Sequence, residues 1–230
     1  MFTSFKNTKI ALPDDFTVTA HSGCEFTSDN SMEFIKKCVE INAQVAEMDI
    51  THRKNGDIVM LHKALAENDE GVLLEDAIKY LAENSNTIKC NLDLKAFDEI
   101  GKAVDIIDTY GMRDRCFFTG VEEAQVKAVK EQGRGVPYYL NVAFSPMKKH
   151  SEKTLREVMK KIQDAGAVGI NCNYIFASKE MVKLFRENGL LLSFWTANTA
   201  RVMKKLLLLS PDNITTRFPL TVKDLIEKHS

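Results

Sequence analysis

Strand-like and helix-like segments alternate along almost the whole chain, and this alternation limits the folds that the chain can adopt. Short apolar runs are typical of buried strands, whereas longer runs with one polar face are typical of helices. The predicted strands are Thr17–His21, Gln44–Thr51, Thr87–Lys95, Cys116–Thr119, Val136–Val142, Val168–Asn171, Leu190–Trp195 and Asn213–Thr216. The predicted helices are Ser31–Ile41, Leu74–Glu83, Asp98–Tyr110, Val121–Gln132, Glu152–Ala165, Ser178–Asn188, Thr199–Leu209 and Pro219–Lys228. Eight strands, each followed by a helix, predict an α/β fold of the (β/α)8 TIM-barrel type.

The main alternative is an open, doubly wound sheet, in which strands and helices also alternate. Such folds typically carry a glycine-rich phosphate-binding loop after an early strand, and the chain contains neither a GxGxxG nor a P-loop motif. A further short segment, Asp57–His62, follows the tight-turn sequence Asn55-Gly56, so we expect it to fold back after the second strand. No linker or tandem repeat interrupts the chain, and residues 1–230 are expected to form a single domain.

Charge and composition exclude several classes of function. The 31 lysine and arginine residues nearly balance the 32 aspartate and glutamate residues, which gives no support to nucleic-acid binding. No apolar run is long enough to span a bilayer, and Met1–Asp15 lacks the apolar core of a secretory peptide. The five cysteines include no CxxC pair, which argues against a zinc site or a disulfide framework. These features together predict a cytoplasmic protein without stable membrane insertion.

Ionisable side chains stand near the ends of the predicted strands. Residues i and i+2 of a strand point to the same face, so Glu47 points the same way as Asp49, and Asp93 the same way as Lys95. His21 ends the first predicted strand. Acidic residues are depleted in strands and are costly to bury without a cation or hydrogen bonds. Because the active sites of barrels lie at the C-terminal ends of the strands, these residues predict a site for a hard metal ion and a phosphate.

Five groups of motifs follow one another along nearly the whole chain. They are His21-Ser22-Gly23 with Asp29-Asn30, then Glu47-Met48-Asp49, then Lys54-Asn55-Gly56 with His62-Lys63, then Asp93-Leu94-Lys95, and finally Trp195-Thr196-Ala197-Asn198 with Ile214-Thr215-Thr216-Arg217-Phe218-Pro219. In this order they resemble the motifs of the glycerophosphodiester phosphodiesterase family, a group of phospholipase C-like phosphodiesterases with a TIM barrel. One such motif alone would be weak evidence, whereas five in order on a matching βα pattern make the resemblance specific.

The resemblance implies a small-molecule substrate, a glycerophosphodiester, which is hydrolysed to glycerol 3-phosphate and an alcohol. It implies a divalent metal ion, Mg²⁺ or Ca²⁺, held by the carboxylates of Glu47, Asp49 and Asp93. It also implies that His21 and His62 act as the general acid–base pair, since imidazole titrates near neutral pH. The sequence does not say which histidine is the acid, which of the two ions binds, or whether the chain forms an oligomer.

The remaining implied roles concern the phosphate. Lys95 would hold it as a point charge, and Ser22 occupies the family's other phosphate-binding position. Trp195 either lines the pocket or packs in the barrel core.

Three positions depart from the family pattern. Ser22 replaces an arginine, so one weak hydrogen bond stands in place of a charged fork. Asp93 replaces a glutamate and is one methylene shorter, and Lys63 replaces the aspartate after the second histidine, where its charge would lower the pKa of His62. The basic residues that could supply the missing charge are Lys63, Arg53 and Arg217.

Three alternative functions fit part of the pattern. A phosphodiesterase acting on a lysophospholipid would use the same site, and a long apolar loop near the strand ends would favour it, but the sequence shows none. A barrel that binds a phosphorylated ligand with little or no turnover would account for Ser22 and Lys63, yet it would not need both histidines. A sugar-acting barrel would account for Glu47 and Asp49 but would leave the histidines unexplained.

Overall fold

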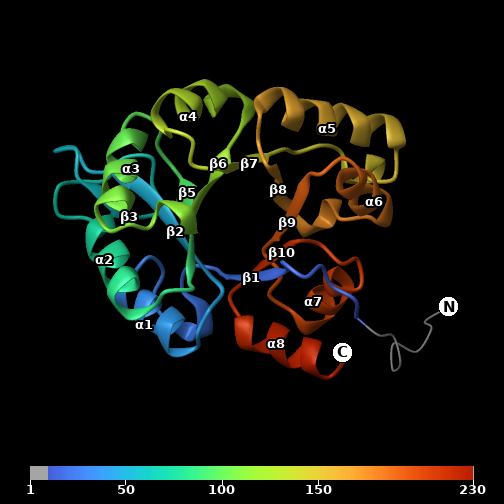
Figure 1. Ribbon diagram of the computed structural model, residues 1–230, viewed down its shortest axis with the longest axis horizontal. Coiled ribbons are helices and arrows are strands. Elements are labelled where there is room, and N and C mark those ends of the chain that lie inside the picture. Colours follow the sequence, from blue (N-terminus) through green and yellow to red (C-terminus); the bar gives the residue numbers. More distant parts are fainter. Residues whose placement is uncertain (1–9, 230) are drawn as a thin grey trace.

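The computed structural model describes residues 10–229, and they form a closed barrel of parallel strands surrounded by helices (Figure 1). The barrel strands are β1 Thr17–Ala20, β2 Val45–His52, β5 Lys89–Leu94, β6 Cys116–Val121, β7 Tyr138–Asn141, β8 Gly169–Asn173, β9 Leu191–Trp195 and β10 Asn213–Thr216. Each strand pairs in parallel with its neighbour, and β1 pairs with both β10 and β2, which closes the ring. The predicted (β/α)8 barrel is confirmed. The prediction about the amino-terminal segment falls partly on residues 1–9, which lie outside the described residues.

A helix follows each barrel strand and covers the outside of the barrel (Figure 1). The helices are α1 Met32–Glu40, α2 Leu74–Asn84, α3 Ile100–Thr109, α4 Val126–Gln132, α5 Glu152–Ala165, α6 Lys179–Glu187, α7 Ala200–Leu207 and α8 Pro219–Glu227. Several begin with a capping hydroxyl: Ser31 accepts a hydrogen bond from the amide of Phe34, and Ser178 accepts one from Met181. Pro219 occupies the first turn of α8, where its missing amide costs nothing.

The fourth helix begins later than the sequence predicts. The predicted range starts at Val121, but this residue ends β6, and α4 begins only at Val126. Gly120, one residue before the end of β6, has a φ of +76°, a backbone conformation that glycine adopts without strain. A one-turn helix over Glu123–Gln125 follows, with a capping box in which Glu122 and Gln125 satisfy each other's free amides. This local hydrogen bonding determines where the helix starts, and the spacing of apolar residues in the sequence does not indicate that position.

A small antiparallel sheet extends β2 beyond the barrel. β3, Ile58–Met60, pairs antiparallel with the last residues of β2, and β4, Val72–Leu73, pairs with β3. The turn between β2 and β3 contains Gly56, whose φ is +88°, and the amide of Gly56 donates to the carbonyl of Arg53. The predicted fold-back after the second strand is confirmed, whereas β4 is an addition that the sequence pattern did not predict.

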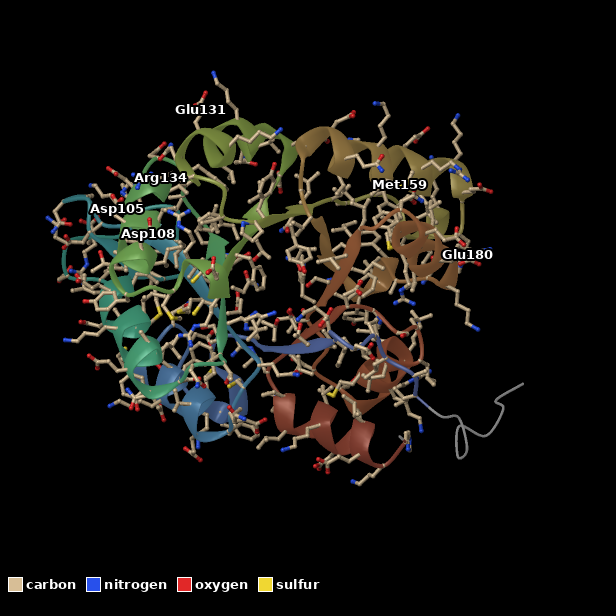
Figure 2. The ribbon with its side chains drawn as sticks, in the orientation of Figure 1. Asp105, Asp108, Glu131, Arg134, Met159 and Glu180 are labelled. Atoms are coloured by element: carbon tan, nitrogen blue, oxygen red, sulfur yellow. The ribbon has the colours of Figure 1, made fainter. Side chains whose placement is uncertain are left out.

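Successive strand residues alternate between two environments. In β2, Ala46, Met48 and Ile50 belong to the apolar layer packed beneath the helices, whereas Glu47 and Asp49 point into the barrel. The outer faces of the helices are polar, and labelled charged residues such as Asp105, Glu131 and Arg134 lie at the periphery (Figure 2). The apolar core therefore lies between strands and helices. The barrel interior near the C-terminal ends of the strands can then hold polar and charged side chains.

The five cysteines are all buried and free, as expected from the lack of a CxxC pair. Among the helices that the structure describes, none has both the length and the apolar character needed to cross a membrane.

Candidate active site

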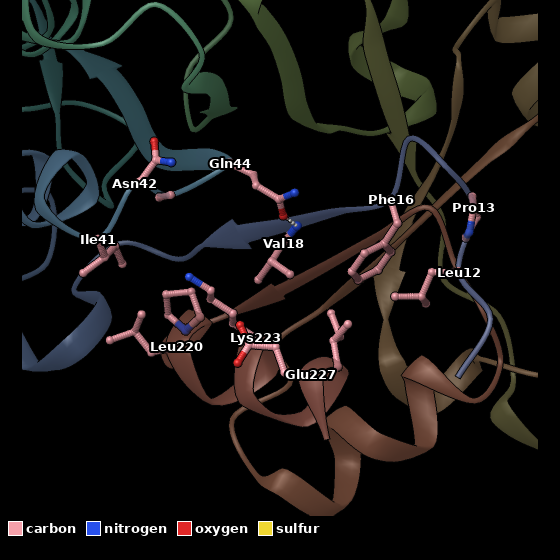
Figure 3. A pocket seen from close by; sticks show the side chains of 13 residues that line it. Leu12, Pro13, Phe16, Val18, Ile41, Asn42, Gln44, Leu220, Lys223 and Glu227 are labelled. Carbon is pink, nitrogen blue, oxygen red and sulfur yellow. Dashed lines mark hydrogen bonds between the residues drawn. The ribbon is translucent and has the colours of Figure 1, made fainter. Parts of the chain in front are cut away.

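Two cavities of similar size compete as the candidate site. One, of about 450 Å³, lies outside the barrel between the start of β1, the end of α1 and α8 (Figure 3). Its walls are mostly apolar, and its charged groups are limited to Lys223 and Glu227. The other, of about 410 Å³, opens at the C-terminal ends of the barrel strands and is lined by His21, Glu47, Asp49, His62, Asp93, Lys95 and Trp195 among others. Only the second cavity combines acids, histidines and a lysine, so it is the candidate active site.

Two neighbouring strands hold the three carboxylates. Glu47 and Asp49 come from β2, and Asp93 comes from β5, directly opposite Asp49 in the register of the two strands. One oxygen from each carboxylate can be chosen so that the three lie within 4.8 Å of one another. The prediction that these three acids meet is therefore confirmed.

Lys95 balances the charge of two of these acids. Its ammonium lies 2.9 Å from Asp49 Oδ1 and also contacts Asp93 Oδ2. Burial alone would lower the pKa of Lys95, but the two carboxylates outweigh it and raise the pKa above its usual value. Burial would likewise raise the pKa of Asp49, but the charge of Lys95 and hydrogen bonds from Asn30 and Lys95 lower it. Lys95 therefore stays protonated, and Asp49 stays ionised.

Glu47 has a different environment. Burial, followed by the charges of Asp49 and Asp93, holds the pKa of Glu47 well above its usual range. The amide of Ser22 donates to Glu47 Oε2 at 2.9 Å and acts in the opposite direction. Among the described residues, no lysine or arginine forms an ion pair with Glu47: Lys95 contacts the other two acids and lowers the pKa of Glu47 only from a distance, and the neighbour of Glu47 is the ring of His21. A bound divalent cation would supply the charge that favours ionised Glu47.

The small sheet after β2 brings His62 to the site. The amide of Leu61 donates to the carbonyl of Asp49, so the residue that follows lies over that carboxylate. His62 Nδ1 is 3.1 Å from Asp49 Oδ1, and the ring is largely exposed at the mouth of the cavity. Nδ1 is thus the ring nitrogen that faces the carboxylate, and Nε2 is left for a substrate.

His21, which follows β1, is oriented by acceptors in a similar way. Its Nδ1 lies 2.9 Å from the carbonyl of Ser22 and 3.8 Å from Glu47 Oε2. Both partners are acceptors, so Nδ1 is the protonated nitrogen, and Nε2 of the neutral ring carries a free electron pair. The cavity therefore has one histidine beside Glu47 and another beside Asp49.

Asn30 and Thr119 orient the acids but were not among the predicted site residues. Asn30 Nδ2 donates to Asp49 Oδ2 at 2.8 Å, and Asn30 Oδ1 accepts from the amide of Asp49 at 3.0 Å. Thr119 on β6 donates its hydroxyl to Asp93 Oδ1 at 2.5 Å. Sequence could have indicated Asn30, which belongs to a family motif, whereas nothing in the sequence marks Thr119.

Comparison with known proteins identifies the family. The model of the "Glycerophosphoryl diester phosphodiesterase family" matches residues 14–221. The chain belongs to this family. A "Glycerophosphodiester phosphodiesterase" of Caldanaerobacter subterraneus is 21% identical over 92% of this chain and 98% of its own length. The predicted family, and with it the assignment as a phosphoric diester hydrolase, is confirmed.

Solved structures of this family share the fold. A phosphodiesterase from Oleispira antarctica, in complex with the product sn-glycerol-3-phosphate, has a TM-score of 0.74, with 16% identity over 94% of this chain and 97% of its own. A glycerophosphodiester phosphodiesterase from Parabacteroides distasonis has a TM-score of 0.73, with 18% identity over 93% of this chain and 98% of its own. At these identities the structures establish a shared fold.

Ser22, which replaces the family arginine, lies beneath the cavity rather than at its wall. It is fully buried, and its hydroxyl accepts a hydrogen bond of 2.6 Å from the amide of Asn30. Its amide is the group that donates to Glu47. Ser22 therefore braces the loop that carries Asn30 and is not among the residues that line the cavity.

The three basic residues considered as replacements have different partners. Lys63 forms an ion pair with Glu70 at 2.5 Å, and the guanidinium of Arg53 donates to the carbonyls of Glu70 and Gly71. Both brace the loop before β4. Arg217 pairs with Asp29 through two hydrogen bonds of 2.6 and 2.9 Å. It is the one of the three whose charge reaches the acidic cluster, because the carboxylates of Glu47 and Asp49 contribute to the raised pKa of its guanidinium.

Trp195 lies in the wall of the cavity, as the first of its two predicted placements required. Its indole Nε1 is buried and has no hydrogen-bond partner among the described residues. A buried donor without a partner is costly unless a ligand accepts from it.

The floor of the cavity is polar, which the sequence showed only in part. Asn171 on β8 donates its side-chain amide to Asn141 Oδ1 on β7 at 3.2 Å. Ser193 donates to Asn171 at 2.9 Å, and Asn213 donates to Thr19 Oγ1 at 2.7 Å. Barrel interiors are usually filled by branched apolar residues, so this buried network makes the interior beneath the site unusually polar.

Proposed function

We propose that the protein is a metal-dependent phosphodiesterase that hydrolyses glycerophosphodiesters to glycerol 3-phosphate and an alcohol, with His21 and His62 as its acid–base pair. The observation that carries the proposal is the meeting of three carboxylates, one lysine and two histidines on a single cavity of the barrel. The relative from Oleispira antarctica, whose structure contains the product sn-glycerol-3-phosphate, supports the same product for this chain.

The donor set fits a hard divalent cation. Glu47, Asp49 and Asp93 offer carboxylate oxygens within 4.8 Å of one another, and oxygen ligands suit Mg²⁺ and Ca²⁺. The shorter side chain of Asp93 does not prevent this, because Thr119 orients it toward the cluster. When bound, the ion would polarise a phosphoryl oxygen and offset the negative charge that develops at phosphorus.

The two histidines would move the protons. Neutral His21 carries a free electron pair on Nε2 and can take the proton from the attacking hydroxyl group. His62 is largely exposed at the mouth of the cavity, where the alcohol would depart, and its Nδ1 faces Asp49 Oδ1 at 3.1 Å, which leaves Nε2 to donate a proton to that alcohol. We therefore assign His21 as the general base and His62 as the general acid.

The phosphate would be held by Lys95 and by groups around it. The ammonium of Lys95 lies between the acids and the cavity, where it can attract a phosphoryl oxygen. The partnerless indole N–H of Trp195 is covered, and it would meet a glycerol or phosphate oxygen once the cavity wall adjusts to a bound substrate. The neutral Ser22 leaves this site with less positive charge than its family pattern provides.

The direct test measures release of glycerol 3-phosphate from glycerophosphocholine with Mg²⁺, with Ca²⁺ and with chelator. Metal-dependent release that is lost in His21→Ala supports the proposal. Tight binding of metal and phosphate without any turnover would instead favour a binding protein.

A change of leaving group separates the two histidine roles. A p-nitrophenyl diester releases an anion that needs no proton, so His62→Ala should retain most of its activity on this substrate. His21→Ala should remain inactive, because the nucleophile still needs a base. The opposite pattern would exchange the two assignments.

A further inference from the structure

Large exposed apolar side chains gather on the face that carries the active site. Single exposed apolar residues are common on soluble proteins, so their distribution is the informative feature. Among the described residues, six large apolar side chains are exposed: Phe26, Leu65, Met147, Ile175, Leu191 and Leu220. Five of them lie in connections that begin at the C-terminal end of a barrel strand, with Leu65 in the loop after β3 and Leu220 in the first turn of α8. Among the six, only Leu191, at the start of β9, lies at the opposite end of the barrel. We call these five residues the apolar rim.

The exposure of Phe26 is enforced by its backbone. Phe26 is 89% exposed, and Glu25 and Phe26 have φ values of +48° and +68°, in the left-handed region that bulky residues rarely adopt. Contacts with the loop before α8 hold this strained turn: the amide of Glu25 donates to the carbonyl of Arg217, and the Glu25 carboxylate accepts from the amide of Leu220. A turn that is held this way presents its aromatic ring to the surroundings instead of folding it inward.

A second part of the rim is formed by the loops after β7 and β8. Met147 lies in a single helical turn, Pro146–Lys148, and is 92% exposed. Lys149 ties the two loops together, because its ammonium donates to the carbonyl of Ile175 at 3.2 Å. The exposed Lys148 beside Met147 adds a positive charge next to an apolar side chain. This combination is typical of loops that enter the interface of a lipid layer.

We propose that the apolar rim enters the surface of a lipid aggregate, and that the active site takes a monoacyl glycerophosphodiester from it. The inference rests on the proposed function and specifies its substrate class. Water would add its oxygen to phosphorus, the bond from phosphorus to the alcohol oxygen would break, and the alcohol would leave with a proton, so a monoacylglycerol phosphate remains.

The arrangement of the rim favours a lipid surface over a protein partner. Protein interfaces need a buried apolar centre in one well-packed patch. The rim side chains instead come from separate segments after β1, β3, β7 and β8 and from the first turn of α8, at the same end of the barrel as the acids and histidines. A fluid surface accepts such separated side chains, and an acylated substrate inserted in it would present its phosphodiester to the same face.

The experiment compares two substrates with the same head group: glycerophosphocholine in solution, and lysophosphatidylcholine in phosphatidylcholine vesicles that contain phosphatidylglycerol. The double variant Phe26→Ser, Met147→Gln should lower the ratio of vesicle to solution activity about tenfold or more, because two apolar side chains no longer enter the lipid. The matched control Leu191→Ser, on the opposite face, should leave this ratio unchanged.

Sedimentation with the same vesicles in chelator measures lipid binding without catalysis. Vesicle binding that falls in the rim variant but not in the control supports the lipid proposal. A failure of all three proteins to hydrolyse any diester would count against the proposed function, and it would leave this result on lipid binding unchanged. Equal vesicle binding and an equal activity ratio in all three proteins would overturn the lipid proposal, while solution activity would leave the proposed function standing. Met147→Gln alone tests the rim away from the strained turn at Phe26.

Discussion

Replacing Lys95 by methionine tests the electrostatic account of the candidate site. Methionine keeps most of the apolar stem and removes the ammonium that contacts Asp49 and Asp93. Carboxylate oxygens of this cluster lie within 4.8 Å of one another, and Coulomb's law with an effective dielectric constant of about 20 gives a repulsion of roughly 3.5 kcal/mol or more for two unit charges at that limit. Removing one partner of a buried ion pair typically costs about 3–5 kcal/mol. The ammonium is partly exposed, so we expect the free energy of unfolding in chelator to fall by about 3 kcal/mol at neutral pH.

The pH dependence has a definite sign. Lys95 contributes to the lowered pKa of Asp49, so this stabilisation is fully present above the usual range of an aspartate and is lost as the pH falls. The difference between the natural protein and Lys95→Met should therefore be largest near neutral pH and should shrink toward pH of about 3. A saturating divalent ion should also reduce the difference, because the ion replaces the lost positive charge.

Denaturant unfolding followed by circular dichroism, with chelator and with Mg²⁺, measures these differences. The matched control is Lys54→Met, which breaks an exposed ion pair with Glu67 and should cost no more than about 1 kcal/mol. Equal stability losses in the two variants in chelator, or a loss at Lys95 that neither acid nor metal reduces, would refute the electrostatic account.

Three further predictions concern single contacts of the site. Trp195→Phe keeps an aromatic ring, although a smaller one, and removes the partnerless N–H donor. The KM for glycerophosphocholine should therefore rise roughly 3- to 10-fold. An unchanged KM would show that no ligand accepts a hydrogen bond from Nε1. Asn30→Ala frees the Asp49 carboxylate and should weaken Mg²⁺ binding about 10- to 100-fold by calorimetry, unless the strand alone orients the acid. Gly23→Ala should clearly lower the melting temperature, because residue 23 has a φ of +75° and the added Cβ would lie 2.0 Å from Asp29 Oδ1. A melting temperature equal to that of the natural protein would show that Asp29 moves away freely.

The fold could be predicted well from sequence, because each element depends on a local pattern. Alternating apolar residues and capping hydroxyls identify the strands and helices, and eight such units leave few architectures. The boundary of α4 could not be predicted in this way, because the left-handed Gly120 and the capping box at Glu122 decide it. The short strand β4 depends on pairing with β3, a contact that has no periodic signal of its own.

Some features of the candidate site could likewise be predicted from the sequence, and others could not. Glu47 and Asp49 are two residues apart on one strand, so their common direction follows from sequence alone. The orientation of Asp93 by Thr119 depends on the register of two neighbouring strands. The burial of the Ser22 hydroxyl beneath Asn30 likewise depends on how the first loop folds. The sequence therefore gave no indication that Ser22 does not line the cavity.

The sequence by itself determined the order of elements, the barrel class and the family, because these follow from local periodicity and from short motifs. Only the tertiary structure decided which nitrogen of each histidine is left for a substrate and which acids Lys95 balances. It also decided that apolar side chains from five separate segments share one face with the site. The physical reason is that pKa, hydrogen bonding and exposure depend on neighbours in space. Closure of the barrel brings together residues as distant in the chain as Phe26 and Phe218, whose ring centres are 5.5 Å apart.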